Sequence, residues 1–359
     1  MYSESDLQSA VAAGAISAEA ADALRTHVAL RPAMPFADEE NIRLITGFND
    51  IFVGIACLLV VFSGVFAGGD KHTWLGGLAV AIASWIMAEI FTRRRRMALP
   101  SIILLISFVV GLGLFAGGLG AQAMPSHRIP HNWSEGDWYS YERYPWQIAL
   151  IALSAAIAAG IGAVAHWLRF HVAITIAAGT AALVLLLLSL LAWTTGLELR
   201  ANPVMAPAAF ACGLGVFAFA MRWDLSDRER RTQRADIAFW LHLLAAPLIA
   251  HPLFFWIGVL DHGRASVPQG LGVLGIYLVF AIVALIVDRR ALLVSALIYV
   301  LVALNGLLDR FGAIEINLAL TTLFIGSALL ALSVFWAPLR RLLMGISPKQ
   351  WRDRLPSTA

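Results

Sequence analysis

Long apolar runs dominate the sequence and limit what the chain can fold into. Between residues 45 and 336, ten such runs follow one another, each close to the roughly 20 residues that a helix needs to cross about 30 Å of hydrocarbon. They lie at residues 45–67, 73–91, 99–123, 146–166, 170–193, 203–221, 237–260, 270–287, 291–308 and 314–336. Inside a bilayer the backbone polar groups must be satisfied within the segment, which favours helices. The sequence therefore predicts an all-α polytopic membrane protein with about ten transmembrane helices.

Composition supports this class and argues against a soluble fold. The chain of 359 residues is 60% hydrophobic and only 14% charged, and its mean hydropathy is +0.77, whereas soluble domains carry about 25% charged residues. The basic residues behind the net charge of +3 sit in short clusters at the ends of the apolar runs. Because such clusters are topology signals, we expect the lipid bilayer as a partner and no nucleic acid.

Loop charges predict the orientation of the chain independently of the apolar runs. With ten spans and the N-terminus in the cytoplasm, every cytoplasmic loop carries at least one Lys or Arg. The basic residues on the other side are Lys71, Arg128, Arg143, Arg200, Arg264 and Arg310, out of 26 in the chain. Positive charge gathers on the cytoplasmic side of membrane proteins, so both termini are predicted to be cytoplasmic.

Residues 1–44 precede the first run and have the pattern of a small cytoplasmic helical hairpin followed by a linker. Gly14 supplies a left-handed stop between the two helices, and Ser17 can cap the second. No basic region followed by a short apolar core occurs here, so we expect no cleaved signal peptide. Residues 45–336 then form the transmembrane bundle, and residues 337–359 a basic cytoplasmic tail.

The hairpin also carries a resemblance. The stretch from Leu7 to Ser17 has the pattern L-x3-VAAGxIS, and an acidic linker and a polytopic remainder follow it. This arrangement resembles a family of uncharacterised bacterial polytopic membrane proteins, a domain of unknown function with an N-terminal cytoplasmic helical hairpin. The resemblance implies a location in the bacterial inner (cytoplasmic) membrane, and it carries over no activity and no functional residue.

The run at residues 237–260 has the most unusual polar pattern, because His242, His251, Pro247 and Pro252 all fall inside predicted hydrocarbon. Each proline removes one backbone hydrogen bond of the helix. The histidines are nine residues apart, which places them on opposite faces of a straight helix. One interpretation is a kinked packing helix whose histidines donate to neighbours; the other is a broken helix at a hydrated site. His251, beside Pro252, is the stronger site candidate, and His242 is predicted to be a packing residue.

Other polar residues complete the candidate intramembrane site. Asp50 lies near the start of the first run, where it either stabilises the helix N-terminus or serves a proton or cation. Asn305 and Asp309 are four residues apart and share one helix face, where they could line a polar pocket or hydrogen-bond to another helix. Glu89 is predicted to form a structural ion pair with Arg93, one turn later.

The loop at residues 124–145 is rich in Trp and Tyr, side chains that prefer the headgroup layer. We therefore expect it to lie on the outer membrane surface, with a ligand-binding lid as the alternative. Pro130 stands between His127 and His131 and prevents an ordinary helical i, i+4 arrangement of the two imidazoles. We expect no metal site there.

Two smaller patterns concern packing. Gly113-xxx-Gly117 in the third run is a spacing that lets another helix approach closely. His166 and His171 flank the short turn around Arg169, and we expect both histidines at the membrane interface.

The sequence argues against some classes of function and leaves three of them open. The chain contains no phosphate loop, no H-E-x-x-H motif and no G-x-S-x-G elbow, so neither ATP-driven pumping by this chain alone nor a cofactor or metal is predicted. Ten spans divide into five plus five, which makes the halves inverted, as in many secondary transporters. This layout favours a transporter-like protein for a small solute. The alternatives are a non-transporting scaffold or sensor whose hairpin binds a protein, and, third, an intramembrane enzyme, against which the scattered polar residues argue.

Overall fold

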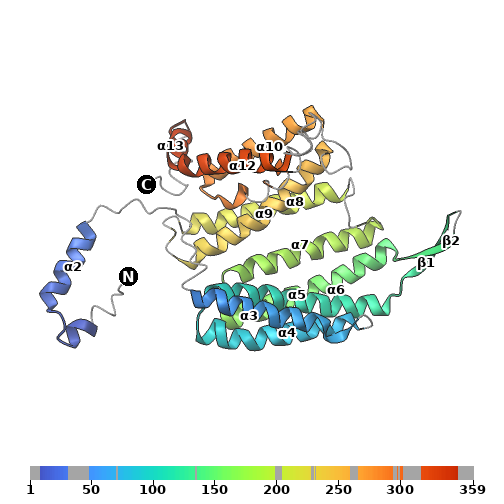
Figure 1. Ribbon diagram of the computed structural model, residues 1–359, viewed down its shortest axis with the longest axis horizontal. Helices are drawn as coiled ribbons and strands as arrows, with labels where there is room; N and C mark the ends of the chain where they lie inside the picture. Colours follow the sequence, from blue (N-terminus) through green and yellow to red (C-terminus); the bar gives the residue numbers. More distant parts are fainter. Residues whose placement is uncertain are drawn as a thin grey trace. The chain divides into compact units, whose positions relative to one another are not determined.

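The computed structural model describes residues 9–30, 48–69, 72–133, 136–198, 204–227, 230, 232–258, 266–293, 297, 300–301 and 317–346. These residues are helical apart from one β-hairpin, as Figure 1 shows. The chain divides into two compact units, Met1–Asn41 with Ala359, and Ile42–Thr358.

The N-terminal unit contains the second helix of the predicted hairpin. Helix α2 (Ala18–Leu30) follows a turn in which Gly14 has φ +71°, and residues 9–12 before the turn are also helical. The backbone N–H of Ala20 donates to the Ser17 hydroxyl at 3.1 Å. The predicted glycine stop and serine cap are therefore confirmed, since each satisfies a local backbone requirement that the sequence alone specifies.

Eight helices in the described part of the larger unit are long and apolar enough to cross a membrane. They are α3 (Phe48–Val65, continued by the 3₁₀ turn η1, Phe66–Gly68), α4 (Thr73–Ala88, continued by the π-helical segment η2, Glu89–Arg94), α5 (Ala98–Ala123), α6 (Pro145–Phe170), α7 (Ile174–Thr195), α8 (Met205–Ser226), α9 (Gln233–Ile257) and α10 (Val267–Val287). This confirms an all-α polytopic membrane protein.

Two further helices follow near the C-terminal end. Helix α12 (Asn317–Val334) and helix α13 (Trp336–Ile346) meet at a sharp bend of 66°, and the bent pair raises the span count to at most nine. The predicted ninth run at residues 291–308 lies mostly outside the described residues. The first ten residues of the predicted basic tail belong to α13.

Consecutive helices pack against one another in two groups. Helices α4, α5, α6 and α7 pack in sequence, with α3 against α4 and α5, whereas α8 and α9 form a second closely packed pair next to α10. Helix α7 contacts both α8 and α9 and so joins the groups. Among the eight spans α9 is the most buried and α3 the least. The central position of α9 makes it the helix around which a site can form.

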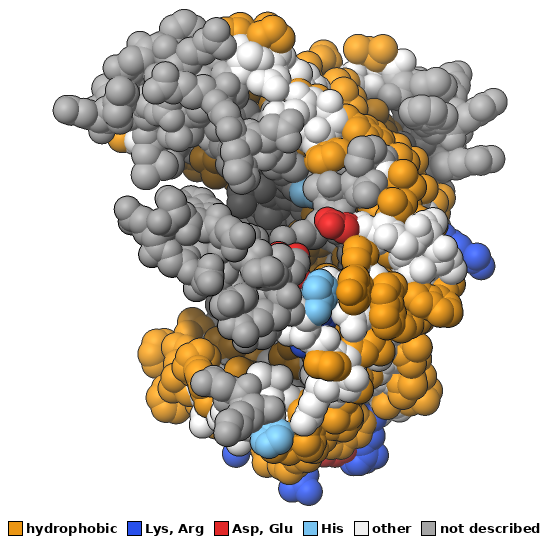
Figure 2. All heavy atoms as spheres, turned by 90° about the vertical axis from the view of Figure 1, so that its right-hand side faces the viewer, with side chains coloured by type: hydrophobic (Ala, Val, Ile, Leu, Met, Phe, Trp, Pro, Cys, Tyr) orange, Lys and Arg blue, Asp and Glu red, His pale blue; other side chains and the backbone are white. Residues whose placement is uncertain are grey.

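The outward faces of the helices are apolar. Phe62, Ile161 and Leu168 are 64%, 66% and 70% exposed, and Figure 2 shows hydrophobic side chains spread over one face of the molecule. An exposed apolar surface of this extent is energetically unfavourable in water. These faces therefore contact lipid.

Glycines set the closest approach between helices, although not the two that the spacing indicated. A Cβ on Gly77 of α4 would lie 2.5 Å from the Phe115 backbone nitrogen, and one on Gly111 of α5 would lie 2.8 Å from that of Ala81. A Cβ on Gly113 would meet nothing nearer than 3.6 Å. The tightest contacts of the third span are thus made by Gly111 and Gly118 against α4, whereas Gly113 and Gly117 face Ala155 of α6 at ordinary van der Waals distances.

The predicted surface loop contains a β-hairpin that the sequence pattern did not indicate. Strands β1 (His127–Trp133) and β2 (Gly136–Glu142) pair antiparallel. At its base the His127 ring stacks on Tyr144 with 4.2 Å between the ring centroids, and Arg143 Nε donates to the Met124 carbonyl at 3.1 Å. The hairpin is therefore fixed to the ends of α5 and α6.

Candidate functional site

A buried cluster of charged side chains joins α8, α9 and the end of α10. His242 Nε2 lies 2.9 Å from Asp224 Oδ2, and Arg289 Nε donates to the same oxygen at 3.2 Å. Arg289 Nη2 donates to the other oxygen, Asp224 Oδ1, and to the Ala235 carbonyl, the latter at 3.2 Å. The side chains of Asp224, His242 and Arg289 are all at most 2% exposed.

The geometry of this cluster follows from where each helix ends. Asp224 lies in the last turn of α8, and Arg289 follows α10 after Asp288, whose left-handed backbone (φ +60°) ends that helix. The planar guanidinium matches the two carboxylate oxygens, which is the arrangement that offsets the cost of removing both charges from water. With Nε2–H donating to the carboxylate, neutral His242 carries no proton on Nδ1, and Nδ1 has no hydrogen-bond partner among the described residues.

A second buried cluster lies next to the first, around Asp288. Trp336 Nε1 donates to Asp288 Oδ1 at 2.8 Å, Arg230 Nη1 donates to Oδ2 at 3.0 Å, and Arg340 Nη1 lies 3.4 Å from Oδ2. Both arginine side chains are less than a tenth exposed. One carboxylate therefore ties the segment after α8 and the helix α13 to the end of α10.

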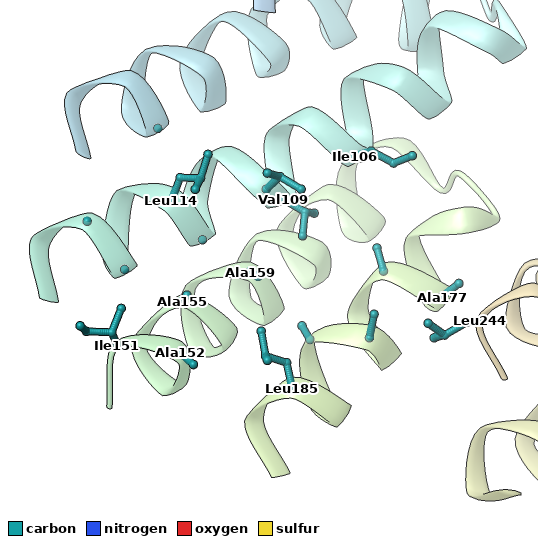
Figure 3. A pocket seen from close by; sticks show the side chains of 18 of the residues that line it. Ile106, Val109, Leu114, Ile151, Ala152, Ala155, Ala159, Ala177, Leu185 and Leu244 are labelled. Atoms are coloured by element: carbon teal, nitrogen blue, oxygen red, sulfur yellow. The ribbon is translucent and has the colours of Figure 1, made fainter. Parts of the chain in front are cut away.

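An apolar cavity of about 1000 Å³, open to the outside along part of its wall, lies on the other side of α9, between this helix and α3, α4, α5, α6 and α7. Figure 3 shows the side chains from α5, α6 and α7 around it, with Leu244 of α9 at its edge. Among the described lining residues, Thr73 and Trp240 alone have a polar side-chain atom. The volume suits a small organic molecule or an acyl chain.

Helix α9 separates the cavity from the charged cluster. Its residues Trp240, Leu243, Leu244 and Pro247 line the cavity, and at about 100° per residue His242 points roughly 150° away from their mean direction. A displacement of α9 relative to α8 that changes the cavity therefore also acts on the contact between His242 and Asp224.

The residues predicted on α9 separate in the structure. His242 is fully buried and bonded within the charged cluster, whereas His251 is exposed and is not among the residues that line the cavity. Pro247 lines the cavity and Pro252 is buried. The helix runs continuously from Gln233 to Ile257 through both prolines, so the interpretation as a broken helix does not describe it.

The remaining predicted site residues are not brought to α9. Asp50 is buried in the first turn of α3, a helix without extensive contact to α9. Asn305 and Asp309 lie outside the described residues. The predicted ion pair of Glu89 with Arg93 is confirmed at 3.2 Å, and Arg169 adds a shorter contact of 2.7 Å to the same carboxylate.

His166 differs from the expectation of an interfacial position. Its side chain is fully buried, contacts the rings of Phe170 and Trp85, and has its Nδ1 3.3 Å from the Thr175 hydroxyl. The turn after α6 folds α7 back over this ring, which encloses it. His171, by contrast, ends α6 in a left-handed conformation (φ +53°).

The described ranges contain no group of three or more His, Cys, Asp or Glu side chains that could hold a metal ion. Comparison of the chain with protein-family models, with curated proteins and with solved structures finds no match.

Proposed function

We propose that this integral membrane protein is transporter-like and takes an apolar or amphiphilic small molecule into the cavity beside α9. The observation that carries the proposal is the cavity itself, which has about 1000 Å³ and is lined by residues from six helices. A concave apolar site of this size between helices is a usual place for a ligand.

The chemistry of the wall selects the class of solute. Ala152, Ala155, Ala181 and Leu185 contribute only hydrocarbon, so an apolar chain gains about 25 cal/mol for each Å² that it buries there. A charged or strongly polar solute would lose its hydration without gaining hydrogen bonds. The proposed substrate is therefore a lipophilic molecule or the acyl part of an amphiphile.

Helix α9 supplies a means of linking occupancy to conformation. The cavity lies on one of its faces, and the opposite face holds His242 against Asp224. Because His242 and Arg289 hold α8, α9 and the end of α10 together through Asp224, an occupant that shifts α9 acts on the contact between this group and α7. A two-state helix arrangement of this kind is what alternating access requires.

The same proposal places the protein in the bacterial inner membrane with both termini in the cytoplasm, on the strength of the loop charges and the family resemblance. We expect a reporter fused at Ser134, in the loop predicted to face the periplasm, to be active if its activity requires export and inactive if its activity requires the cytoplasm. A phosphatase reporter and a fluorescent cytoplasmic reporter at this position measure this directly. Activity of the cytoplasmic reporter would contradict the orientation.

Filling the cavity is expected to weaken ligand binding strongly. The probe is a palmitate analogue with a photoreactive diazirine in its chain, added to the full-length protein in lipid nanodiscs. Wild type should show labelling that saturates and that unlabelled palmitate displaces, on peptides from α6, α7 and α9. Ala152→Trp combined with Ala181→Trp should reduce the saturable labelling at least about fivefold, because the indoles occupy the space of the chain.

The matched control uses two exposed alanines of α8 that do not line the cavity, Ala211→Trp with Ala218→Trp. This variant should label like wild type. Saturable labelling that survives in the cavity-filled protein, or wild-type labelling that never saturates, would overturn the proposal.

A further inference from the structure

Helix α13 has a buried face and an exposed apolar face. Trp336, Arg340 and Met344 are buried against the protein. A second face, formed by Leu339, Leu342 and Ile346, is exposed at 37%, 63% and 79% of each side chain's surface. The spacing of three and four residues makes this second face a continuous apolar stripe along the helix.

The orientation of this stripe is fixed by the buried face. Trp336 donates to Asp288 at 2.8 Å, and Arg340 lies 3.4 Å from the same carboxylate, one turn further along α13. With two successive turns held against the end of α10, the helix cannot rotate its apolar stripe inward. Within the part of the chain that the structure describes, the stripe therefore stays on the outer surface.

The stripe continues the lipid-facing surface of α12. Leu330, Val334 and Phe335, just before α13, are 70%, 74% and 56% exposed. The bend of 66° then turns the chain away from the direction of α12, as Figure 1 shows. A helix that leaves a span at such an angle, with its outward face still apolar, lies along the membrane surface.

A basic residue stands on the side of α13 away from the stripe. Arg341 is exposed, and at about 100° per residue it projects roughly 130° from the centre of the stripe, toward the aqueous side of a helix that lies in the interface. The Arg290 guanidinium is also close, 4.9 Å from the centroid of the Trp336 ring. Positive charge at this depth attracts anionic headgroups.

We propose that α13 is an interfacial helix that inserts Leu339, Leu342 and Ile346 into the leaflet at this end of the spans and enriches anionic phospholipid there through Arg341. The apolar stripe attaches the helix to the membrane, and Arg341 favours anionic headgroups over neutral ones.

The test uses the full-length protein with its cysteines replaced (Cys57→Ala, Cys212→Ala) and a fluorescent label on Ile346→Cys. The protein is reconstituted in vesicles of phosphatidylcholine and phosphatidylglycerol in which one lipid or the other carries a nitroxide quencher at carbon 5. We expect strong quenching at position 346, and stronger quenching by the glycerol lipid than by the choline lipid at equal mole fraction. Arg341→Gln should reduce that lipid preference by up to about fivefold, whereas Arg341→Lys should keep it.

A label on Ala337→Cys is the matched control, because Ala337 is exposed on the opposite side of α13, and its quenching should be weak. Salt at 0.5 M should weaken the lipid preference but not the quenching at position 346. Equal quenching at positions 337 and 346 would overturn the insertion, and equal quenching by the two lipids in the wild-type background would overturn the choice of anionic lipid. Loss of quenching at position 346 with rising protein density would assign the stripe to a second copy of the chain and overturn the proposal.

Discussion

Arg289→Ala is expected to destabilise the folded protein by about 3–5 kcal/mol, the range found when one partner of a buried ion pair is removed. The substitution leaves the Asp224 carboxylate, 1% exposed, without its guanidinium partner and removes the hydrogen bond that Arg289 donates to the Ala235 carbonyl. His242 alone cannot compensate, because it contacts one carboxylate oxygen only. Thermal unfolding in detergent, followed by circular dichroism, measures the effect.

Two further variants separate charge burial from lost packing. Removing both charges together, with Asp224→Asn and Arg289→Met, should cost much less than the sum of the single substitutions, because neither charge is then left uncompensated. Arg95→Ala is the control at an exposed arginine and should change stability by less than about 0.5 kcal/mol. Strictly additive losses in the double variant would show that the two side chains act independently.

The membrane class could be predicted because it depends on local properties. A run of about 20 apolar residues must become a helix wherever the lipid solvent excludes unpaired backbone groups. The run predicted at residues 146–166 is α6 (Pro145–Phe170), and the one at 237–260 overlaps α9. Gly14 and Ser17 were predictable for a similar reason, since a turn and a cap each need only their own neighbours in sequence.

The charged cluster could not be predicted in the same way, because its members are far apart in the chain. Asp224 and Arg289 are separated by 65 positions, and an arginine at the end of an apolar run is usually a topology signal at the interface. The signal that was present is the acidic residue beside each basic group, Asp224 after Arg222 and Asp288 before Arg289. An acid and a base of this kind at the same end of two spans can neutralise each other and be buried together.

The histidines illustrate the same limit. The nine-residue separation correctly placed His242 and His251 on different faces of α9, since helical geometry is local. Which face is buried depends on α8, whose Asp224 lies 2.9 Å from His242. His251, the stronger candidate by its position beside Pro252, is instead the exposed one. Sequence periodicity gives directions around a helix but not the neighbours in those directions.

Asp288→Asn is expected to release α13 from the end of α10. The carboxylate accepts from Trp336 and is paired with Arg230 and Arg340, so its neutralisation removes a negative charge that two arginines, each less than a tenth exposed, share. Asparagine tolerates the left-handed backbone at this position (φ +60°) better than alanine does, so the variant isolates the loss of charge from backbone strain.

Trypsin provides the measurement, because it cleaves after arginine only where the helix opens. In the wild-type protein Arg340 is buried, 3% exposed, and cleavage there should be slow; in Asp288→Asn it should be faster by at least about tenfold, as local opening becomes favourable. Glu198→Gln, at an exposed carboxylate, is the control and should leave the cleavage rate unchanged. Unchanged cleavage at Arg340 in Asp288→Asn would mean that packing of Trp336 and Met344, and not the carboxylate, holds α13 in place.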